Sequence, residues 1–345
     1  MKISKKIAIL ATALLSLALI SCKTDSSETG SSNPNPTLPG TKGGTDNDKD
    51  IFAGKTFYDS SKKEQAEYGY TKYTFSENGT VAITYTKKDD EKEKSYEKAI
   101  INYSLSEDGK TVYMTYNKIR NPLGSTGSLF TYKELEQYLY NDYAKDALDN
   151  LNKEDPEQSK FYKENAAKEV GLDSYTTDEE LLAAMQKYST EHAEEMLSPL
   201  HKMFNTVFQY NLSTDEEDKH PVLTEKNTWG KDLSKFISLN GDSYYDCGNS
   251  SSSEVFYSFN FYYSKGNPSG SYYYYNIGET SNPNYYVKKA DSSKIYFESS
   301  EDEEGNTTKL EAPYTISDDG NTLTLTIDGK TIEAKLTLDE MHLYN

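Results

Sequence analysis

The sequence predicts an α+β protein in which two antiparallel β-meander or barrel-like units are separated by a segment of three to four helices. Apolar and polar residues alternate from Ile51 to about Ile119 and again after Trp229, which is typical of half-buried strands. Between these stretches the apolar residues recur at helical spacing. The resulting segments are an apolar N-terminus (1–21), a low-complexity stretch (22–50), a first β unit (51–127), a helical segment (128–212) and a tyrosine-rich second β unit (213–345).

The N-terminal segment has the composition of a signal peptide. Lys2, Lys5 and Lys6 precede a run from Ile7 to Ile20 that carries no charge. A helix that crosses a bilayer core permanently needs roughly 20 apolar residues, and this run is shorter. An export signal is therefore favoured over a retained transmembrane helix.

The run ends in Leu19-Ile20-Ser21-Cys22, which resembles the lipobox of bacterial lipoproteins: an apolar residue, a small residue and an obligatory cysteine. The resemblance implies cleavage after Ser21 and lipid attachment to Cys22. It also implies an exported protein, anchored in the cell membrane or outer membrane and facing the periplasm or the cell surface. Two or three acyl chains, at about 0.8 kcal/mol per buried CH₂, hold a protein durably. An ordinary secretory peptide with a chance cysteine is the alternative.

Residues 23–50 follow the lipidated Cys22 and consist mainly of Gly, Ser, Thr, Asn, Pro and Asp. Such a composition cannot bury enough apolar surface to fold. We expect a disordered tether that ends at Asp50.

The chain is strongly acidic. Its formal net charge is −19, and the loss of the three lysines in residues 1–21 makes it −22. Phosphate backbones and anionic headgroups repel such a chain, which argues against nucleic acid and against a polybasic membrane contact as partners. If Cys22 carries lipid, Cys247 is the remaining thiol, and no internal disulfide can form.

Short turn motifs define the first β unit. Asn78-Gly79 and Asp108-Gly109 each separate two stretches of alternating apolar residues, which is a strong hairpin signal. Residues 51–127 are therefore predicted to form a β-meander.

The helical segment shows start and stop signals. A capping box over residues 131–134 opens a helix whose apolar stripe runs to Leu151. Residues 155–171 carry an N-terminal Asp-Pro and a C-terminal Gly, which predict a second helix. A third begins near Thr177 and is predicted to be broken or kinked by Pro199.

The second β unit contains a short sequence pattern, here called the sequence echo, that also occurs in the first. Residues 103–115 and 314–326 share the pattern Tyr-x-[Leu/Ile]-Ser-x-Asp-Gly, and a further hairpin turns at Asp328-Gly329. The echo indicates either a duplicated β unit or two similar acidic hairpins. Because each unit contains its own hairpins, we expect two separate units and not one barrel split by the helices.

The segment Gly54-Lys55-Thr56-Phe57, together with residues 73–81 and 314–326, resembles the small lipocalin-like domains of bacterial lipoproteins, notably those of spirochaetes. That family usually has Gly-x-Trp where this chain has Gly-Lys-Thr-Phe. The resemblance implies a role in binding a ligand or partner, without catalysis.

No catalytic residue, metal site or cofactor is predicted. The histidines are His192, His201, His220 and His342, and none of them is at metal-pair spacing. The sequence has no Gly-x-Ser-x-Gly elbow, no phosphate-binding glycine loop and no dinucleotide fingerprint. Cys247 has no basic residue close in sequence and is interpreted as a structural or free thiol.

Tyrosines are the predicted binding residues, because each combines a flat apolar face with a polar tip that suits sugars and partner proteins. The predicted ligand surface comprises Tyr262, Tyr263, Tyr272, Tyr274 and Tyr285. Because strand residues point alternately to two faces, some of these serve as wall or core. The predicted function is a lipid-anchored envelope protein that binds a small molecule, glycan or protein; the alternative is a glycan-directed envelope hydrolase whose acidic residues are unidentified.

Overall fold

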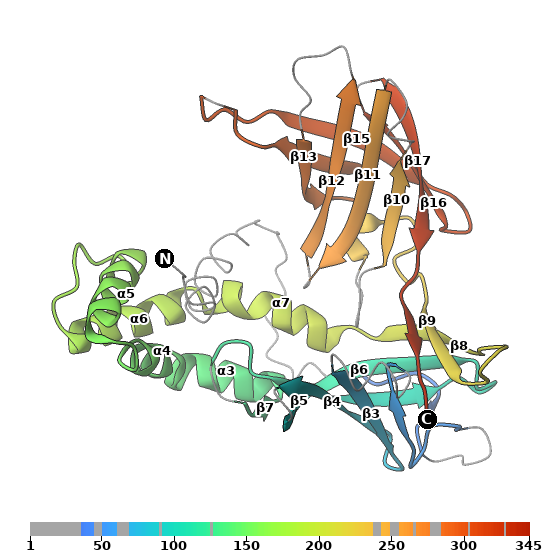
Figure 1. Cartoon of the computed structure of the whole chain (residues 1–345), viewed down its shortest axis with the longest axis horizontal. Helices are drawn as coiled ribbons and strands as arrows, with labels where there is room; N and C mark the ends of the chain where they lie inside the picture. The colour runs from blue at the N-terminus through green and yellow to red at the C-terminus, as the bar shows by residue number, and fades with distance from the viewer. Residues whose placement is uncertain are drawn as a thin grey trace. The chain divides into compact units, whose positions relative to one another are not determined.

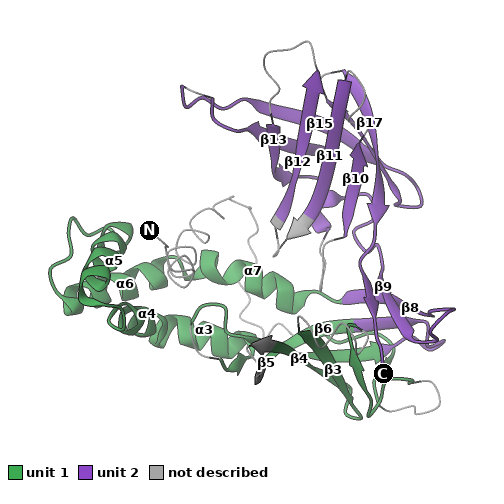
Figure 2. Cartoon of the chain, viewed as in Figure 1, with its two compact units in different colours: residues 1–104, 114–207 green, residues 105–113, 208–345 purple. Residues whose placement is uncertain are grey.

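The computed structural model describes residues 36–44, 50–60, 69–89, 92–124, 127–236, 243–248, 255–264, 267–276, 284–302, 304–327 and 329–345. The predicted signal peptide, Ser21, Cys22 and most of the tether lie outside these residues. The chain forms two compact units, one of residues 1–104 and 114–207 and the other of residues 105–113 and 208–345 (Figure 2).

Two antiparallel β structures and a helical segment confirm the predicted α+β class (Figure 1). The first is a ten-stranded sheet with the order β18-β9-β8-β6-β5-β4-β3-β2, in which β1 also pairs with β5 and β7 with β6. Its strands are β1 (Thr41–Lys42), β2 (Thr56–Tyr58), β3 (Tyr70–Ser76), β4 (Thr80–Asp89), β5 (Lys92–Leu105), β6 (Thr111–Arg120), β7 (Leu129–Phe130), β8 (Phe208–Thr214), β9 (Pro221–Glu225) and β18 (Glu340–His342).

The second β structure is a closed eight-stranded barrel whose strands follow one another in chain order. They are β10 (Tyr244–Gly248), β11 (Val255–Ser264), β12 (Asn267–Asn276), β13 (Asn284–Ala290), β14 (Lys294–Ser299), β15 (Lys309–Ile316), β16 (Thr322–Ile327) and β17 (Lys330–Thr337). β10 closes the barrel by pairing with β17, where Tyr244 lies opposite Thr337. Closure leaves no open edge strand in the barrel.

The first sheet also takes strands from the region predicted to be the second β unit. β8 and β9 form a hairpin in which Thr214 lies opposite Pro221, and β18 pairs with β9 through His342 and Val222. Residues 213–345 are therefore not one β unit, because the barrel occupies residues 244–337 and the strands before and after it belong to the other sheet. Alternation alone marks a strand but does not say which sheet it joins.

Residues 36–44 and Asp50, which belong to the predicted tether, pack against the first β structure, which corrects the expected boundary at Asp50. β1 pairs with β5, and Ser104 Oγ donates to the Pro39 carbonyl at 2.5 Å. Asp50 is buried, and its carboxylate accepts hydrogen bonds from Gly44 N at 2.7 Å and from Tyr103 Oη at 2.8 Å. These polar contacts hold a segment that has almost no apolar side chains.

The helical segment contains five helices, where three or four were predicted. They are α3 (Tyr132–Asn141), α4 (Tyr143–Leu151), α5 (Pro156–Glu169), α6 (Asp178–Glu191) and α7 (Ala193–Asn205). The predicted capping box is present, since Thr131 and Glu134 exchange hydrogen bonds at the start of α3. The apolar stripe that predicted one helix to Leu151 is divided at Asp142, whose φ of −120° lies outside the helical range.

Of the predicted break or kink at Pro199, the break is wrong. Pro199 lies inside α7, and the division falls earlier, at His192, whose φ is −106°. Proline removes one backbone donor, but α7 continues around it. None of the described helices is long and apolar enough to cross a membrane.

The sequence echo corresponds to two hairpin turns with the same hydrogen bonds. In the first, Ser106 Oγ donates to Asp108 Oδ1 at 2.6 Å, and Gly109 N donates to the Ser106 carbonyl at 2.8 Å. In the second, the corresponding distances for Ser317, Asp319 and Gly320 are 2.5 and 2.9 Å. Both glycines have positive φ, 70° and 75°, which explains why the pattern requires glycine there.

Candidate binding face of the barrel

The barrel interior is occupied by side chains. All eight strands contribute to one buried cluster, and their inward residues in it are Tyr245, Phe259, Phe261, Tyr272, Tyr285, Val287, Ile295, Phe297, Ala312, Tyr314, Ile316, Leu323, Leu325, Ile327, Ile332 and Ala334. An eight-stranded barrel is just wide enough for its side chains to fill it. The surface of the barrel that can bind a ligand is therefore its outside.

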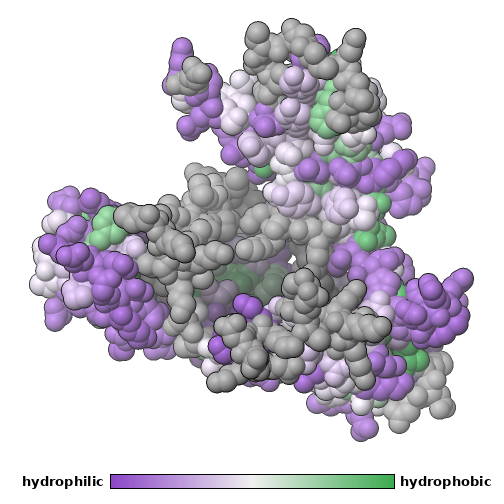
Figure 3. Space-filling view, in the orientation of Figure 1, coloured by the Kyte–Doolittle hydropathy of each residue, from purple (hydrophilic) through white to green (hydrophobic). Residues whose placement is uncertain are grey.

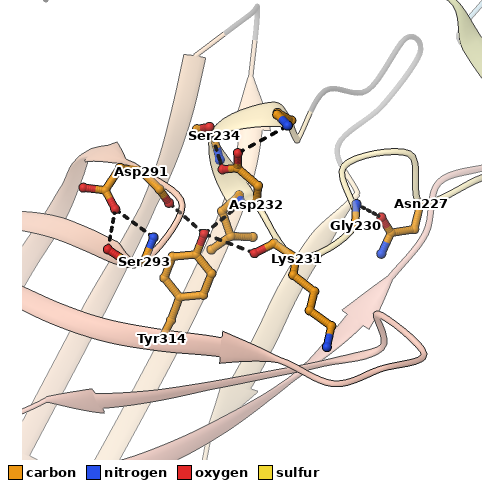
Figure 4. Close-up of polar contacts among 10 residues, drawn as sticks. Asn227, Gly230, Lys231, Asp232, Ser234, Asp291, Ser293 and Tyr314 are labelled. Atoms are coloured by element: carbon orange, nitrogen blue, oxygen red, sulfur yellow. Dashed lines mark hydrogen bonds and ion pairs between the residues drawn. The ribbon is translucent and has the colours of Figure 1, made fainter.

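The segment before the barrel adds Trp229, Leu233 and Phe236 to the same cluster. These residues are not on barrel strands, and because the barrel is closed they reach its core through an end. Figure 4 shows how the segment is held: the Tyr314 hydroxyl accepts a hydrogen bond from Leu233 N at 3.0 Å and donates to the Asp291 carbonyl at 2.7 Å. The short 3₁₀ helix η1 (Leu233–Lys235) thus covers barrel core.

Most of the tyrosines predicted to bind a ligand face inward. Tyr272 and Tyr285 are 1% and 9% exposed, and their rings stack with centroids 6.3 Å apart. Tyr274 packs against the same core, with Lys330 Nζ over its ring. Tyr262 faces outward opposite Tyr244, and the side chain of Tyr263 lies outside the described residues.

Besides Tyr262, the outward positions of β11, β12 and β13 carry aromatic residues that were not in the predicted set. We call Phe256, Tyr273, Tyr275 and Tyr286 the outer aromatic face. Phe256 lies directly opposite Tyr275 in the ladder, and its ring is 5.7 Å from that of Tyr273. Tyr286 lies on the next strand with its side chain 48% exposed.

Small polar residues lie between these rings. Ser258 is opposite Tyr273, Asn284 is opposite Tyr273 on the other side, and Ser271 is opposite Tyr286. Their hydroxyl and amide groups can donate and accept hydrogen bonds beside flat apolar surfaces. The face therefore combines stacking surfaces with uncharged polar groups.

Two of the three strands of this face carry no charge, which separates them from most of the barrel. Neither β11 nor β12 contains an acidic or basic residue, although 27% of the whole chain is charged. The outward positions of β13 to β15 instead carry ion pairs, such as Lys294 with Glu311 at 2.7 Å and Lys288 with Glu298 at 3.3 Å. In the space-filling view, the barrel shows pale residues of intermediate hydropathy beside strongly hydrophilic ones (Figure 3).

Cys247 lies on the inward side of β10 and packs against the barrel core. Burial raises the pKa of its thiol from 9.0 to about 11. A thiol with so high a pKa is protonated at neutral pH and is a poor nucleophile. This agrees with the interpretation of Cys247 as a structural or free thiol.

The histidines divide into two groups. His192 and His201 are on the helices, where His192 stacks on Tyr188 with ring centroids 4.1 Å apart. His220 and His342 come together, with Nε2 of His220 2.8 Å from Nδ1 of His342. They are 122 residues apart in the chain, so spacing gave no signal that they meet.

Asp50 and Glu225 are the buried carboxylates among the residues that the structure describes. Asp50 accepts four hydrogen bonds, three of them from backbone N–H groups. Glu225 accepts from Ser243 Oγ, which also accepts from Asp339 N at 3.0 Å. Both carboxylates join segments distant in sequence.

No known family model, curated protein or solved structure matches this chain.

Proposed function

We propose that this protein is a lipid-anchored cell-envelope lipoprotein that binds a neutral glycan through the outer aromatic face, without catalysing a reaction. The observation that carries the binding role is the aromatic surface on the outside of a filled barrel, two of whose three strands carry no charge. An up-and-down barrel occurs with many functions, so the site and not the fold supports the proposal.

Ring exposure and chemistry favour a glycan over the other ligand classes. Tyr275 and Tyr286 are 37% and 48% exposed, so each presents aromatic surface on which a sugar can stack. Ser258, Ser271 and Asn284 lie beside the rings and can pair with sugar hydroxyls. β11 and β12 carry no charge, and the charged groups beside Tyr286, Lys288 and Glu298, pair with each other at 3.3 Å. The face therefore has few groups to pair with a strongly charged polymer.

A binding assay tests the glycan role. The full-length protein is titrated with neutral polysaccharide extracted from the producing cells, and the Tyr275→Ser/Tyr286→Ser double variant is compared with it. Loss of two exposed rings should weaken binding at least about tenfold, which corresponds to about 1.4 kcal/mol. The control is Tyr140→Ser, which removes an equally exposed tyrosine from α3.

Equal affinity of the double variant and the wild type would refute the assignment to this face. A further outcome is that the wild type binds no glycan but binds a protein partner, and that the double variant loses this binding. The outer aromatic face would then still be the binding site, with a protein as its ligand.

The anchor is tested separately. The sequence Leu19-Ile20-Ser21-Cys22 supports lipid attachment. Replacing Cys22 with alanine should abolish fatty-acid labelling and partitioning into the detergent phase. Continued labelling of the variant would contradict the anchor and leave the glycan test unaffected. Protease treatment of intact cells then shows whether the protein faces the outside.

A further inference from the structure

Three side chains that can bind a metal meet at one end of the β8-β9-β18 strands. Asp215 follows β8, His220 precedes β9, and His342 ends β18. One ligand atom from each of the three lies within 4.8 Å of the others. The register explains the meeting, since Thr214 is opposite Pro221 and Val222 is opposite His342.

We propose that Asp215, His220 and His342 form a site for a divalent transition-metal ion such as Zn²⁺. Two imidazole nitrogens and one carboxylate oxygen are ligands that Zn²⁺ favours, with bonds of about 2.0–2.2 Å. Three protein ligands leave a position for water or for a fourth ligand.

The separation of the two histidines fits a shared ion. Two nitrogens bound to one ion at about 2.0–2.1 Å lie about 2.9 Å apart at a right angle and about 3.3 Å apart at a tetrahedral angle. Nε2 of His220 and Nδ1 of His342 are 2.8 Å apart and share one proton as a hydrogen bond. On binding, the proton of this hydrogen bond moves to the other nitrogen of the ring that carries it, and a small opening of the pair then places both lone pairs on the ion.

The surroundings hold both rings in place. Glu340 Oε2 lies 3.5 Å from the other ring nitrogen of His342, Nε2, and metal-binding histidines commonly face a carboxylate in this way. Tyr344 lies against His220 with ring centroids 4.1 Å apart. The His220 ring is 6% exposed, and its Nδ1 has no hydrogen-bond partner among the described residues. The contact with His342 is thus the hydrogen bond that fixes this buried ring.

Asp215 is held in position by its own loop. Its Oδ1 accepts hydrogen bonds from Glu217 N at 2.9 Å and from Asp218 N at 2.8 Å, and its backbone N donates to the His220 carbonyl at 2.9 Å. The carboxylate is therefore fixed near the histidine pair before an ion arrives. Less reorganisation is then needed on binding.

The ion would have a structural consequence at the C-terminus. β18 is a three-residue strand at the end of the sheet order, and Leu343 N donates to the Pro221 carbonyl at 2.9 Å. An ion bound by His220 and His342 joins this strand to the β8-β9 hairpin. The site thus clips the C-terminal strand to the sheet, independently of the proposed glycan face.

Calorimetric titration of the full-length, chelator-treated protein with Zn²⁺ tests the site. We expect binding of one ion per chain, and in the Asp215→Asn and His342→Asn variants we expect affinity to fall about 10–100-fold. His201→Asn, which changes a histidine on α7, is the matched control and should bind as the wild type does. Excess Mg²⁺ should not compete, because Mg²⁺ prefers oxygen ligands.

Amide hydrogen exchange gives a second readout that does not depend on affinity measurements. Zn²⁺ should slow exchange at Leu343 in the wild type and in His201→Asn, but not in His342→Asn. Absence of one-to-one binding by the folded wild type, or unchanged binding in both the Asp215 and His342 variants, would overturn the proposal. Zn²⁺ binding that excess Mg²⁺ displaces would overturn it too, because it would indicate diffuse attraction to an acidic chain.

Discussion

Replacing Tyr103 with phenylalanine removes one hydroxyl from the contact that orders the end of the predicted tether. The hydroxyl donates to Asp50 Oδ2 at 2.8 Å, and the same oxygen accepts from Gly44 N at 2.7 Å. The Tyr103 ring also packs edge-on against Phe75, with centroids 5.2 Å apart, and phenylalanine retains that contact. The substitution therefore isolates the hydrogen bond to a buried carboxylate.

The expected loss is about 2 kcal/mol, because hydrogen bonds to charged groups contribute about 1.5–3 kcal/mol and Asp50 keeps its three backbone donors. At about 1.4 kcal/mol per factor of ten, the Gly44 amide should exchange about 30-fold faster in Tyr103→Phe than in the wild type. Hydrogen exchange is the appropriate assay, because a chain of two units need not unfold in one transition.

The control is Tyr70→Phe, which removes the hydroxyl of a half-buried tyrosine on β3. If Tyr103→Phe speeds exchange at Gly44 no more than this control does, the Asp50 contact does not hold the segment and the reasoning is wrong.

The same pair makes a prediction about alkaline pH. Burial, followed by the contact with Asp50, raises the pKa of Tyr103 above its ordinary value of 10.0. The neutral hydroxyl therefore stabilises the folded state fully below pH 10, and this contribution is lost as the pH rises further. Protection of Gly44 should fall above pH 10 in the wild type and change less in Tyr103→Phe.

Three further predictions concern the barrel. Alkylation of Cys247 by iodoacetamide, followed by mass spectrometry, should speed up with a midpoint near pH 11, and a midpoint near 9 would mean that the thiol is not buried against the core. The stabilisation of the fold by the neutral thiol is complete below pH 9 and is lost as the pH rises through about 11. Hydrogen bonds from Ser293 N and then Tyr296 Oη lower the pKa of Asp291 from 3.8 to about 2. The ionised Asp291 carboxylate therefore stabilises the folded state above pH 3.8, and this stabilisation is lost as the pH falls through about 2. Asp291→Asn should thus lower the melting temperature at pH 7 and change it little at pH 2, and equal effects at both pH values would contradict this. Expressed alone, residues 225–339 should unfold in one cooperative transition, because they contain all barrel strands and the Glu225–Ser243–Asp339 contacts. A fragment without such a transition would show that the barrel depends on the rest of the chain.

Local signals in the sequence predicted most of the secondary structure. The capping box at Thr131, the Asp155-Pro156 helix start and the Ser-x-Asp-Gly turns are all present, because each depends on side chains within a few residues of the backbone groups they bind. The helix breaks at Asp142 and His192 were missed, since they leave the apolar stripe almost unchanged.

The inward and outward faces of the barrel strands were only partly predictable. Alternation places Phe259 and Phe261 on one face of β11, and they are buried. The orientation of the neighbouring tyrosines on β12 depends on the register between strands, in which Phe259 lies opposite Tyr272. A shift by one residue would have exchanged the two faces, which is why the predicted ligand residues included Tyr272 and Tyr285.

The sequence by itself determined the presence of hairpins, helices, an acidic surface and a lipobox-like N-terminus, because these depend on composition and on neighbours in the chain. Only the tertiary structure decided that β9 and β18 join the first sheet and that His220 meets His342 across 122 residues. Such meetings depend on which strand edges are free when the sheet forms, and a strand's own sequence specifies its alternation but not its partner.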